Sequence, residues 1–368
     1  MASKTTVLFA GGGTGGHLYP GLAIARTLVR LDPDVQPVFI GALRGIEKTV
    51  LPGTEFPHLL LDLHPLYRTK VWENWRTIRG ALGAWRQLHS LATSRKPVLV
   101  VGTGGYAAGI ALAYAAFHRI PIVQQAGDSY PGLTARAFRR WTTEYYLAFP
   151  EAGRVIGGEA AQHVDTGAPI EPPPRPRPDR AAARRAWGFP EHGGQVLLIY
   201  GGSQGSRAIN LVVAEWVRRG LPDDLHLIWM TGKASYAEFA ALDGARVKVR
   251  EYLAPIADAY AATDLALVRA GAMTTAELFA WEIPAVLVPL PTAAADHQSV
   301  NARALEAAGA AIQVRQAELT ADRLDTTMRE LMREPGAMTR LAAGAAARAR
   351  PDAAHTIARR ILTLLGRG

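Results

Sequence analysis

The sequence contains no cysteine, and this absence removes several kinds of chemistry at once. Disulfides, thiolate metal sites and cysteine nucleophiles are excluded, and the composition fits a reducing compartment. Acidic residues are also outnumbered, because 32 Asp and Glu stand against 41 Lys and Arg and leave a formal charge of +9. A basic balance favours an anionic partner such as nucleic acid, an acidic membrane surface or a phosphorylated substrate.

We expect neither a targeting signal nor a membrane span. Lys4 precedes a strand-like run directly, and no small-residue cleavage site follows it. Residues 97–117 carry no charge, but glycines interrupt them, whereas a true span is evenly apolar over about 20 residues. We therefore interpret this segment as a buried strand, a glycine loop and a packed helix.

The 368 residues alternate short apolar runs with helical patterns, which is typical of an α/β protein with mostly parallel sheets. The proline-rich run Ile170–Asp179 can be neither helix nor central strand, so we expect it to link two domains. After this run, residues 195–213 repeat the opening plan of strand, glycine loop and helix. The pattern predicts two Rossmann-like domains facing across a cleft, with ligands beyond the carboxyl ends of the strands. An amphipathic helix is predicted over Asp352–Leu365. Strands are expected at 7–11, 37–41, 59–63, 97–102, 121–125, 144–149, 226–232, 247–253, 265–271 and 285–290, and helices at 22–31, 78–91, 110–117 and 133–140.

The first glycine loop contains a literal G-x-G-x-x-G at Gly11, Gly13 and Gly16. A dinucleotide site also needs an acidic residue at the end of the second strand. Here that strand ends in Gly-Ala-Leu, and Glu47 lies several residues beyond, so the partner is missing. A P-loop signature is absent too. The loop can still hold another anion on helix N–H groups; the alternative is a tight turn without a ligand.

His17 follows this loop at the expected start of a helix, so we expect it to face the cleft. An imidazole there can act as a general base, because its ordinary pKa lies near the working pH. A structural cap or a phosphate contact is the alternative role. The chain also contains a D-x-D at Asp32-Pro33-Asp34, which we interpret as a turn that ends a helix rather than as a metal site.

Four motifs together resemble the MurG family, bacterial glycosyltransferases of GT-B architecture (family 28 type). They are GGGTGGHLYPGLA from Gly11, GTGGYAAG from Gly102, GGSQGSRAIN from Gly201, and RAGAMTTAEL with PTAAADHQSVNARAL between Arg269 and Leu305. The resemblance covers nearly the whole chain in the right order. It implies inverting transfer of N-acetylglucosamine from UDP-GlcNAc to the C4 hydroxyl of MurNAc in undecaprenyl-pyrophosphoryl-MurNAc-pentapeptide (lipid I), which gives lipid II.

The resemblance also implies the domains: residues 1–168 with the C-terminal helix 350–368 for the acceptor, and residues 169–349 for the donor. In the donor domain Leu253 would lie by the uracil, Glu277 would bind the ribose hydroxyls and Gln298, with Asp296 nearby, would read the sugar. The first turn of a helix would hold the UDP phosphates through Ala272, Met273 and Thr274, and Ser203 and Gln204 would face the departing diphosphate. Taken alone, Glu277 could be an ordinary solvated helix residue.

In the acceptor domain the resemblance implies that His17 is the base and that the two glycine loops hold the lipid pyrophosphate. The residues concerned are Thr14, Gly15, Gly16, Gly104, Gly105 and Tyr106. The sequence departs from the family pattern at Gln125–Asp128 and at Glu171, where a family arginine is missing. Gln125 could contact the acceptor, Asp128 is a second candidate base, and Arg207 or Arg269 could replace the lost cation. No metal and no cofactor is expected.

Aromatic and basic residues alternate between Arg68 and Leu91 and suit the surface of an anionic leaflet. The membrane-contact candidates are Trp72, Trp75, Arg76, Arg79 and Trp85. The alternative is that some of these tryptophans pack in the core. The resemblance implies a peripheral protein on the cytoplasmic face of the bacterial inner membrane, with possible cell-wall synthesis partners. Nucleic acid is not an expected partner, since no recognition module is present.

Three other functions stay open at this point. The chain could be a GT-B transferase with another lipid or small acceptor, or a non-catalytic cell-wall scaffold that keeps nucleotide binding. A sugar-nucleotide epimerase shares the architecture, but we would expect more acidic and histidine residues in its cleft.

Overall fold

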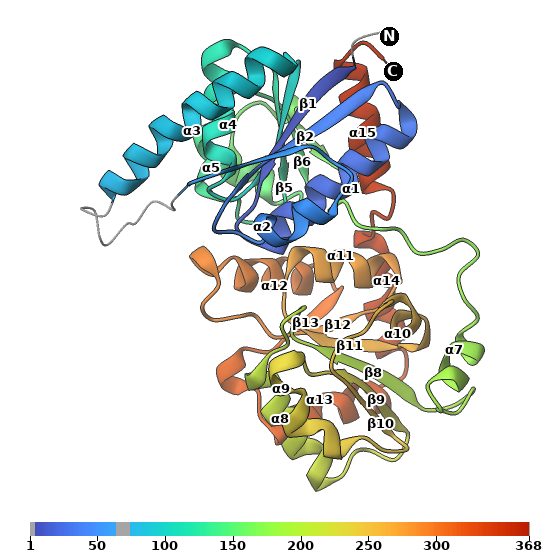
Figure 1. The fold of residues 1–368 in the computed structure, drawn as a ribbon. Helices are drawn as coiled ribbons and strands as arrows, with labels where there is room; N and C mark the ends of the chain where they lie inside the picture. Colours follow the sequence, from blue (N-terminus) through green and yellow to red (C-terminus); the bar gives the residue numbers. More distant parts are fainter. Residues whose placement is uncertain (1–3, 64–73, 368) are drawn as a thin grey trace. The chain divides into compact units, whose positions relative to one another are not determined.

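The structure, a computed structural model, describes residues 4–63 and 74–367; the side chains of 74–79, 81 and 294 lie outside the description. The chain divides into two compact units (Figure 1). The N-terminal unit comprises Met1–Glu171 and Asp352–Gly368, and the C-terminal unit comprises Pro172–Pro351. No helix of the described residues is long and apolar enough to cross a bilayer.

Within its described residues, the N-terminal unit is built on a seven-stranded parallel sheet in the order β3-β2-β1-β4-β5-β6-β7. Parallel strands are covered on both faces, and side chains of β1 alternate accordingly. Val7 and Phe9 pack against helices α1 and α15, whereas Leu8 and Ala10 pack against α3 and α4. The strands are β1 (Thr5–Gly11), β2 (Val35–Ala42), β3 (His58–Leu61), β4 (Leu99–Gly104), β5 (Ile122–Ala126), β6 (Thr142–Leu147) and β7 (His163–Asp165), and the helices are α1 (Gly15–Leu31), α2 (Glu47–Val50), α3 (Asn74–Arg95), α4 (Ala108–His118), α5 (Leu133–Ala137), α6 (Ala152–Ile156) and α15 (Ala353–Leu364).

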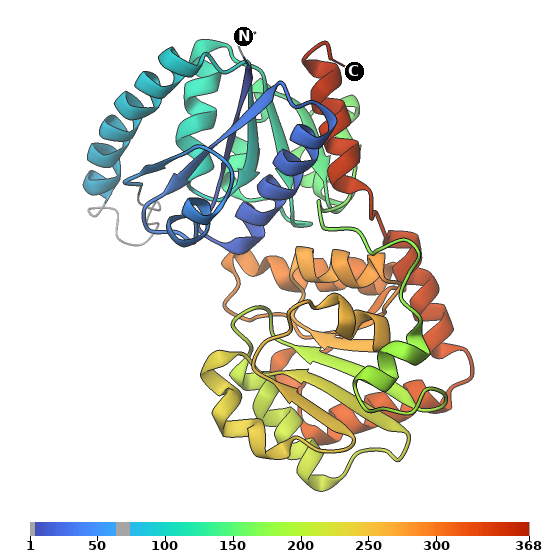
Figure 2. The same cartoon turned by 45° about the vertical axis from the view of Figure 1, so that its right-hand side comes forward.

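The C-terminal helix α15 completes the N-terminal unit, as expected from the sequence. It lies beside α1 in both views (Figures 1 and 2). Ile357 and Ile361 are fully buried between the helix and the sheet. Two ion pairs fix its polar side: Arg360 with Glu144 at 2.6 Å and Arg367 with Asp32 at 2.7 Å.

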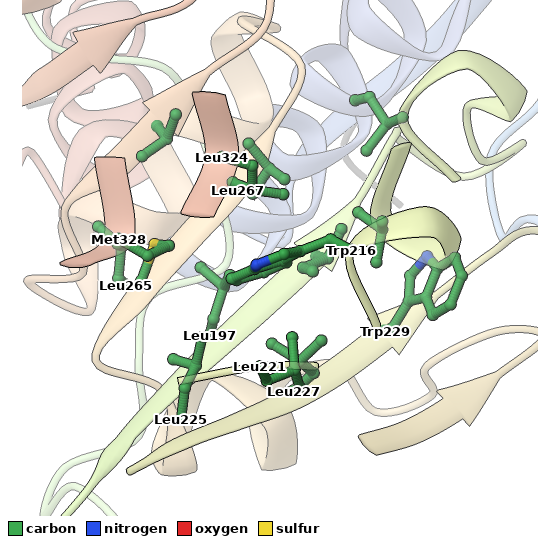
Figure 3. Close-up of a cluster of buried hydrophobic side chains, with 14 of the residues drawn as sticks. Leu197, Trp216, Leu221, Leu225, Leu227, Trp229, Leu265, Leu267, Leu324 and Met328 are labelled. Atoms are coloured by element: carbon green, nitrogen blue, oxygen red, sulfur yellow. The ribbon is translucent and has the colours of Figure 1, made fainter. Parts of the chain in front are cut away.

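The described part of the C-terminal unit repeats this plan with a six-stranded parallel sheet, in the order β10-β9-β8-β11-β12-β13. Trp216 of α8 is buried in the centre of a cluster of leucines from β8, β9 and β11 (Figure 3). The strands are β8 (Gln195–Tyr200), β9 (Leu225–Met230), β10 (Val247–Arg250), β11 (Leu265–Val268), β12 (Ala285–Leu287) and β13 (Ala311–Gln313), and the helices are α7 (Arg180–Ala186), α8 (Arg207–Arg219), α9 (Lys233–Phe239), α10 (Ala257–Ala262), α11 (Ala272–Ala280), α12 (His297–Ala307), α13 (Ala321–Arg333) and α14 (Ala337–Arg348).

The structure confirms the α/β class and the two Rossmann-like units, and it corrects some element boundaries. Residues 166–179 form neither helix nor strand, as the prolines predicted. The helix expected over 133–140 ends at Ala137, because a 3₁₀ turn over Arg139–Trp141 follows it. The helix expected from Leu22 begins earlier, at Gly15, so that His17 lies within its first turn.

Candidate active site

In both sheets the strand order reverses next to the first strand of the unit, between β1 and β4 and between β8 and β11. Such switch points are where open parallel sheets bind ligands, beyond the carboxyl ends of the strands. The loops at these points are the glycine loops found in the sequence. We call residues 11–17 with 104–106 the N-terminal site and residues 201–206 with 269–277 the C-terminal site.

The two loops of the N-terminal site touch each other closely. Gly12 N–H donates to the Gly104 carbonyl at 3.3 Å. Gly104 and Gly105 have φ values of 97° and 78°, a conformation that favours glycine. A Cβ on Gly105 would lie 2.0 Å from the Gly12 carbonyl oxygen, and one on Gly104 would lie 2.7 Å from the His17 ring. The glycines of the second motif are therefore required by the first loop and by His17.

His17 is the third residue of α1 and is half-buried. Its Nδ1 lies 3.2 Å from the Gly12 carbonyl oxygen and 3.2 Å from Thr14 Oγ1. A carbonyl can only accept, so the Gly12 contact requires a proton on Nδ1, whereas the Thr14 hydroxyl can donate or accept. We assign the proton to Nδ1 on the Gly12 contact, which makes Nε2 the accepting nitrogen of the neutral ring. Thr103 Oγ1 donates to the His17 carbonyl at 2.7 Å and fixes the backbone. The arrangement can take a proton at Nε2.

The other predicted residues of the glycine loops surround this imidazole. Thr14 is the N-cap of α1 and makes no side-chain cap bond. The N–H groups of Gly15 and Gly16 thus begin a helix whose positive dipole end suits an anion. The Tyr106 ring lies against Gly13, where an added Cβ would be 3.0 Å from it.

One departure from the family pattern, Gln125–Asp128, lies at the end of β5. Gln125 is 2% exposed, and both polar atoms of its amide are buried without a hydrogen-bond partner among the described residues. Such a group costs free energy unless water or a ligand satisfies it. Asp128 is half-buried in the loop that follows.

Glu47 contacts the N-terminal site in a way that the sequence argument missed. Its side chain is fully buried, and Oε1 accepts from Gly13 N–H at 2.9 Å and from Ala42 N–H at 3.2 Å. A Cβ on Gly12 would lie 1.7 Å from Glu47 Oε1, and one on Gly45 would lie 2.0 Å from Oε2. Glu47 therefore accepts from one N–H group of the first glycine loop. Gly41 and Gly45, which shortly precede Glu47 and make room for its side chain, were the available signal.

The first loop of the C-terminal site exposes Ser203 and Gln204 at its tip. Gly202 and Gly205 have positive φ, and a Cβ on Gly205 would lie 2.0 Å from the Thr231 carbonyl oxygen. The turn after β9, at Thr231, therefore packs directly against this glycine loop.

The second loop leads into α11, whose first turn contains Ala272, Met273 and Thr274. The N-cap is Gly271, which offers no side-chain cap, so the first N–H groups are suited to an anion. Arg269 precedes them and is buried. It donates to Ser206 Oγ and Gln316 Oε1 at 2.7 Å and to the Val288 and Pro289 carbonyls. Burial lowers the pKa of Arg269. Arg207, by contrast, is exposed and pairs with Glu238.

Glu277 ends a chain of buried hydroxyls. Tyr260 donates to Glu277 Oε2 at 2.9 Å, and the Tyr200 and Tyr260 hydroxyls are 2.9 Å apart. Because the single Tyr260 proton is used by Glu277, Tyr200 must donate to Tyr260. Burial, followed by the neighbouring Tyr200 and Glu277, raises the pKa of Tyr260. The sequence argument missed both tyrosines.

The remaining predicted donor residues lie on separate elements of the C-terminal unit. Leu253 is buried after β10. Gln298 Oε1 accepts from Leu290 N–H at 3.0 Å, which leaves the amide NH₂ as its donating end. Ala295 and Asp296 precede α12 with φ values of 53°, a strained conformation for residues other than glycine.

The D-x-D segment forms the turn expected from the sequence. Asp32 is the C-cap of α1, its Oδ1 accepts from Asp34 N–H at 2.9 Å, and its Oδ2 pairs with Arg367. Among the described residues there is no cluster of three or more His, Asp or Glu side chains that could hold a metal.

The proposed membrane-contact residues are described only in part. Trp72 lies outside the described residues, and so do the side chains of Trp75, Arg76 and Arg79 on α3. Trp85 is half-buried and contacts the tilted Tyr114 ring and the edge-on Phe117 ring, with ring centroids 5.2 and 5.8 Å away. Leu82 and Phe117 are 65% and 74% exposed on the same two helices.

The family models for glycosyltransferase family 28 match both units. The N-terminal domain model matches residues 7–147, and the C-terminal domain model matches residues 196–357. The chain belongs to glycosyltransferase family 28. The matched ranges contain the glycine loops of both units.

Relatives and solved structures specify the branch of this family. The chain is 40% identical to the UDP-N-acetylglucosamine–N-acetylmuramyl-(pentapeptide) pyrophosphoryl-undecaprenol N-acetylglucosamine transferase of Salinibacter ruber, over 98% of this chain and 97% of the relative. It is 36% identical to the enzyme of the same name from Symbiobacterium thermophilum, over 96% of this chain and 95% of the relative. The crystal structure of Acinetobacter baumannii MurG matches with a TM-score of 0.76 at 26% identity, over 98% of this chain and 99% of that one. The chain is therefore a family 28 member of the MurG branch.

Proposed function

We propose that this protein transfers N-acetylglucosamine from UDP-GlcNAc to the C4 hydroxyl of MurNAc in lipid I, with inversion at the anomeric carbon. The observation that carries the proposal is the presence, in a MurG-branch chain, of one anion-accepting glycine loop at the switch point of each sheet. Both substrates contain a pyrophosphate, so each unit has one to bind.

The C-terminal site is the proposed donor site. The UDP phosphates bind at the N–H groups of Ala272, Met273 and Thr274, and the exposed loop with Ser203 and Gln204 covers the departing diphosphate. Glu277 accepts from the ribose hydroxyls, in an orientation held by Tyr260. Leu253 lies by the uracil, and the NH₂ of Gln298 donates to a sugar hydroxyl.

Arg269 supports the donor site by its charge. Its guanidinium donates to two carbonyls, a hydroxyl and an amide oxygen, all neutral, so its charge is not cancelled by a carboxylate of the described residues. A buried positive charge beside the phosphate loop stabilises the negative charge that grows on UDP. The charge of Arg269 thereby takes over part of the role of the arginine that the family carries where this chain has Glu171.

The N-terminal site is the proposed acceptor site, where both glycine loops and Tyr106 hold the lipid pyrophosphate. Gln125 uses its buried amide for the acceptor, and Asp128 stays the second candidate base. His17 is the preferred base, because its Nε2 is the accepting nitrogen of the neutral ring.

Transfer proceeds as one displacement. The MurNAc O4 forms the new bond to C1 of the sugar while the bond from C1 to the β-phosphate oxygen breaks. The electron pair of the broken bond leaves with UDP, and the O4 proton passes to His17 Nε2. In the oxocarbenium-like transition state, helix N–H groups and Arg269 stabilise the negative charge that grows on the departing UDP.

The protein works at the surface of an anionic membrane, where its lipid acceptor lies, on the cytoplasmic face. Exposed Leu82 and Phe117, together with the basic residues of α3, supply an apolar and cationic contact.

A UDP-release assay with and without lipid I tests the proposed function. Release that requires lipid I supports transfer. Release without lipid I indicates a hydrolase or a different acceptor, UDP-GlcNAc isomerisation without release indicates an epimerase, and UDP binding without turnover indicates a scaffold.

A further inference from the structure

Glu47 and His17 contact the two ends of one peptide group. That group joins Gly12 to Gly13. Its N–H donates to Glu47 Oε1 at 2.9 Å, and its carbonyl lies 3.2 Å from His17 Nδ1. In a trans peptide these two ends point in opposite directions, so the carboxylate lies on one side and the imidazole on the other.

We infer that Glu47 is a positioning residue for the base, acting on His17 through the Gly12–Gly13 peptide. The inference rests on the proposed role of His17. Glu47 holds the N–H and so turns the carbonyl toward Nδ1, which keeps the proton on Nδ1 and the lone pair on Nε2. Hydrogen bonds in series also polarise one another, so the negative charge favours the imidazolium that forms during transfer. The logic is that of a carboxylate that orients a catalytic histidine, with a peptide inserted between them.

The surroundings of Glu47 favour this role over a simple structural one. The side chain is fully buried, and its Oε2 has no hydrogen-bond partner in the described structure. A buried carboxylate with an unsatisfied oxygen costs stability, and a neutral side chain that kept one acceptor for the Gly13 and Ala42 N–H groups would serve a purely structural role without burying a charge. Three glycines also leave room for it, at positions 12, 41 and 45. We therefore expect the site to use the acceptor oxygen or the charge of Glu47, since its burial costs stability.

The first test is Glu47→Gln, which keeps an acceptor oxygen and the volume but removes the charge. We expect kcat to fall about ten- to a hundredfold, the usual effect of losing an outer orienting partner. The acid limb of the kcat/KM profile should move to lower pH, because removing a negative charge disfavours the imidazolium. KM for UDP-GlcNAc should stay within twofold. Glu55→Gln is the matched control, since Glu55 pairs with Arg26 on the surface of the same unit.

A double-mutant cycle separates this inference from the proposed function. If Glu47 acts through His17, Glu47→Gln should cause no further loss of kcat in a His17→Asn background. An equal loss in both backgrounds, or an unmoved acid limb in Glu47→Gln alone, would overturn the inference and leave the base assignment intact. An acid limb that survives in His17→Asn overturns the base assignment, and the inference falls with it.

A measurement on the unmodified protein covers the case in which Glu47→Gln does not fold. The ¹⁵N chemical shifts of the His17 ring in the full chain report which nitrogen carries the proton. We expect the Nδ1–H tautomer. An Nε2–H tautomer would overturn the inference.

Discussion

Removal of the Tyr260 hydroxyl should weaken UDP binding while leaving the fold intact. Tyr260→Phe deletes the donor to Glu277 Oε2 and the acceptor of the Tyr200 proton, both at 2.9 Å. A hydrogen bond to a charged group contributes about 1.5–3 kcal/mol, and water at the half-buried Glu277 recovers part of that. We therefore expect a loss of about 1–2 kcal/mol in binding, which is about a 5- to 30-fold rise in the Kd of UDP.

Isothermal titration with UDP measures this Kd directly, and steady-state kinetics give the companion result. KM for UDP-GlcNAc should rise by a similar factor while kcat at saturating donor changes little, because the ribose contact is the same in the ground and transition states. Tyr236→Phe on α9 is the matched control, with the same atom removed from the same unit. A Kd within twofold of the unmodified protein would refute the proposed link between Tyr260, Glu277 and the ribose.

Three further predictions concern the base, the core and the surface. His17→Ala should lower kcat about 10²- to 10⁴-fold with an unchanged Kd for UDP, since a general base contributes that much; equal loss of UDP affinity would refute the assignment. The pKa of Asp325 is lowered, first by its hydrogen bond from Arg329, with a further bond from Trp216 Nε1 at 3.0 Å. The stability that this pKa shift contributes is present above the unfolded-state pKa of about 3.9 and is lost as pH falls through the lower folded-state pKa. Asp325→Asn should therefore lower Tm at pH 7, and the difference in Tm from the unmodified protein should shrink below about pH 4. A difference in Tm that stays constant with pH would contradict this. Phe117→Ser should weaken binding to anionic vesicles by about tenfold, the value of one buried aromatic side chain, with transfer to a water-soluble acceptor unchanged; equal vesicle binding would contradict the surface contact.

The repeated local plan made the fold predictable. Apolar runs such as Val7–Gly11 and Gln195–Tyr200, each followed by a glycine loop and a helix, dictate parallel strands and locate the switch points. The short edge strands β7 and β13 were missed, because three residues carry too little periodicity to be recognised.

The candidate site was predictable only where its residues are adjacent in sequence. The helix start at Ala272–Thr274 and the position of Glu277 follow from one motif. The contact of Gly105 with Gly12, and that of Tyr260 with Glu277, depend on how separate βα units pack together. In the sequence, Glu47 was considered only as a ribose-binding residue of a dinucleotide site, for which it lies too far along the chain. Its hydrogen bond from the Gly13 N–H is a tertiary contact that the sequence does not reveal.

Transfer of radiolabelled GlcNAc from UDP-GlcNAc to lipid I, with UDP followed in parallel, tests the central claim most directly. The account predicts label in a lipid product in a 1:1 ratio to released UDP, with Gln125, Asp128 and Glu171 tolerated as they stand. Tight UDP binding without label in the lipid would contradict it.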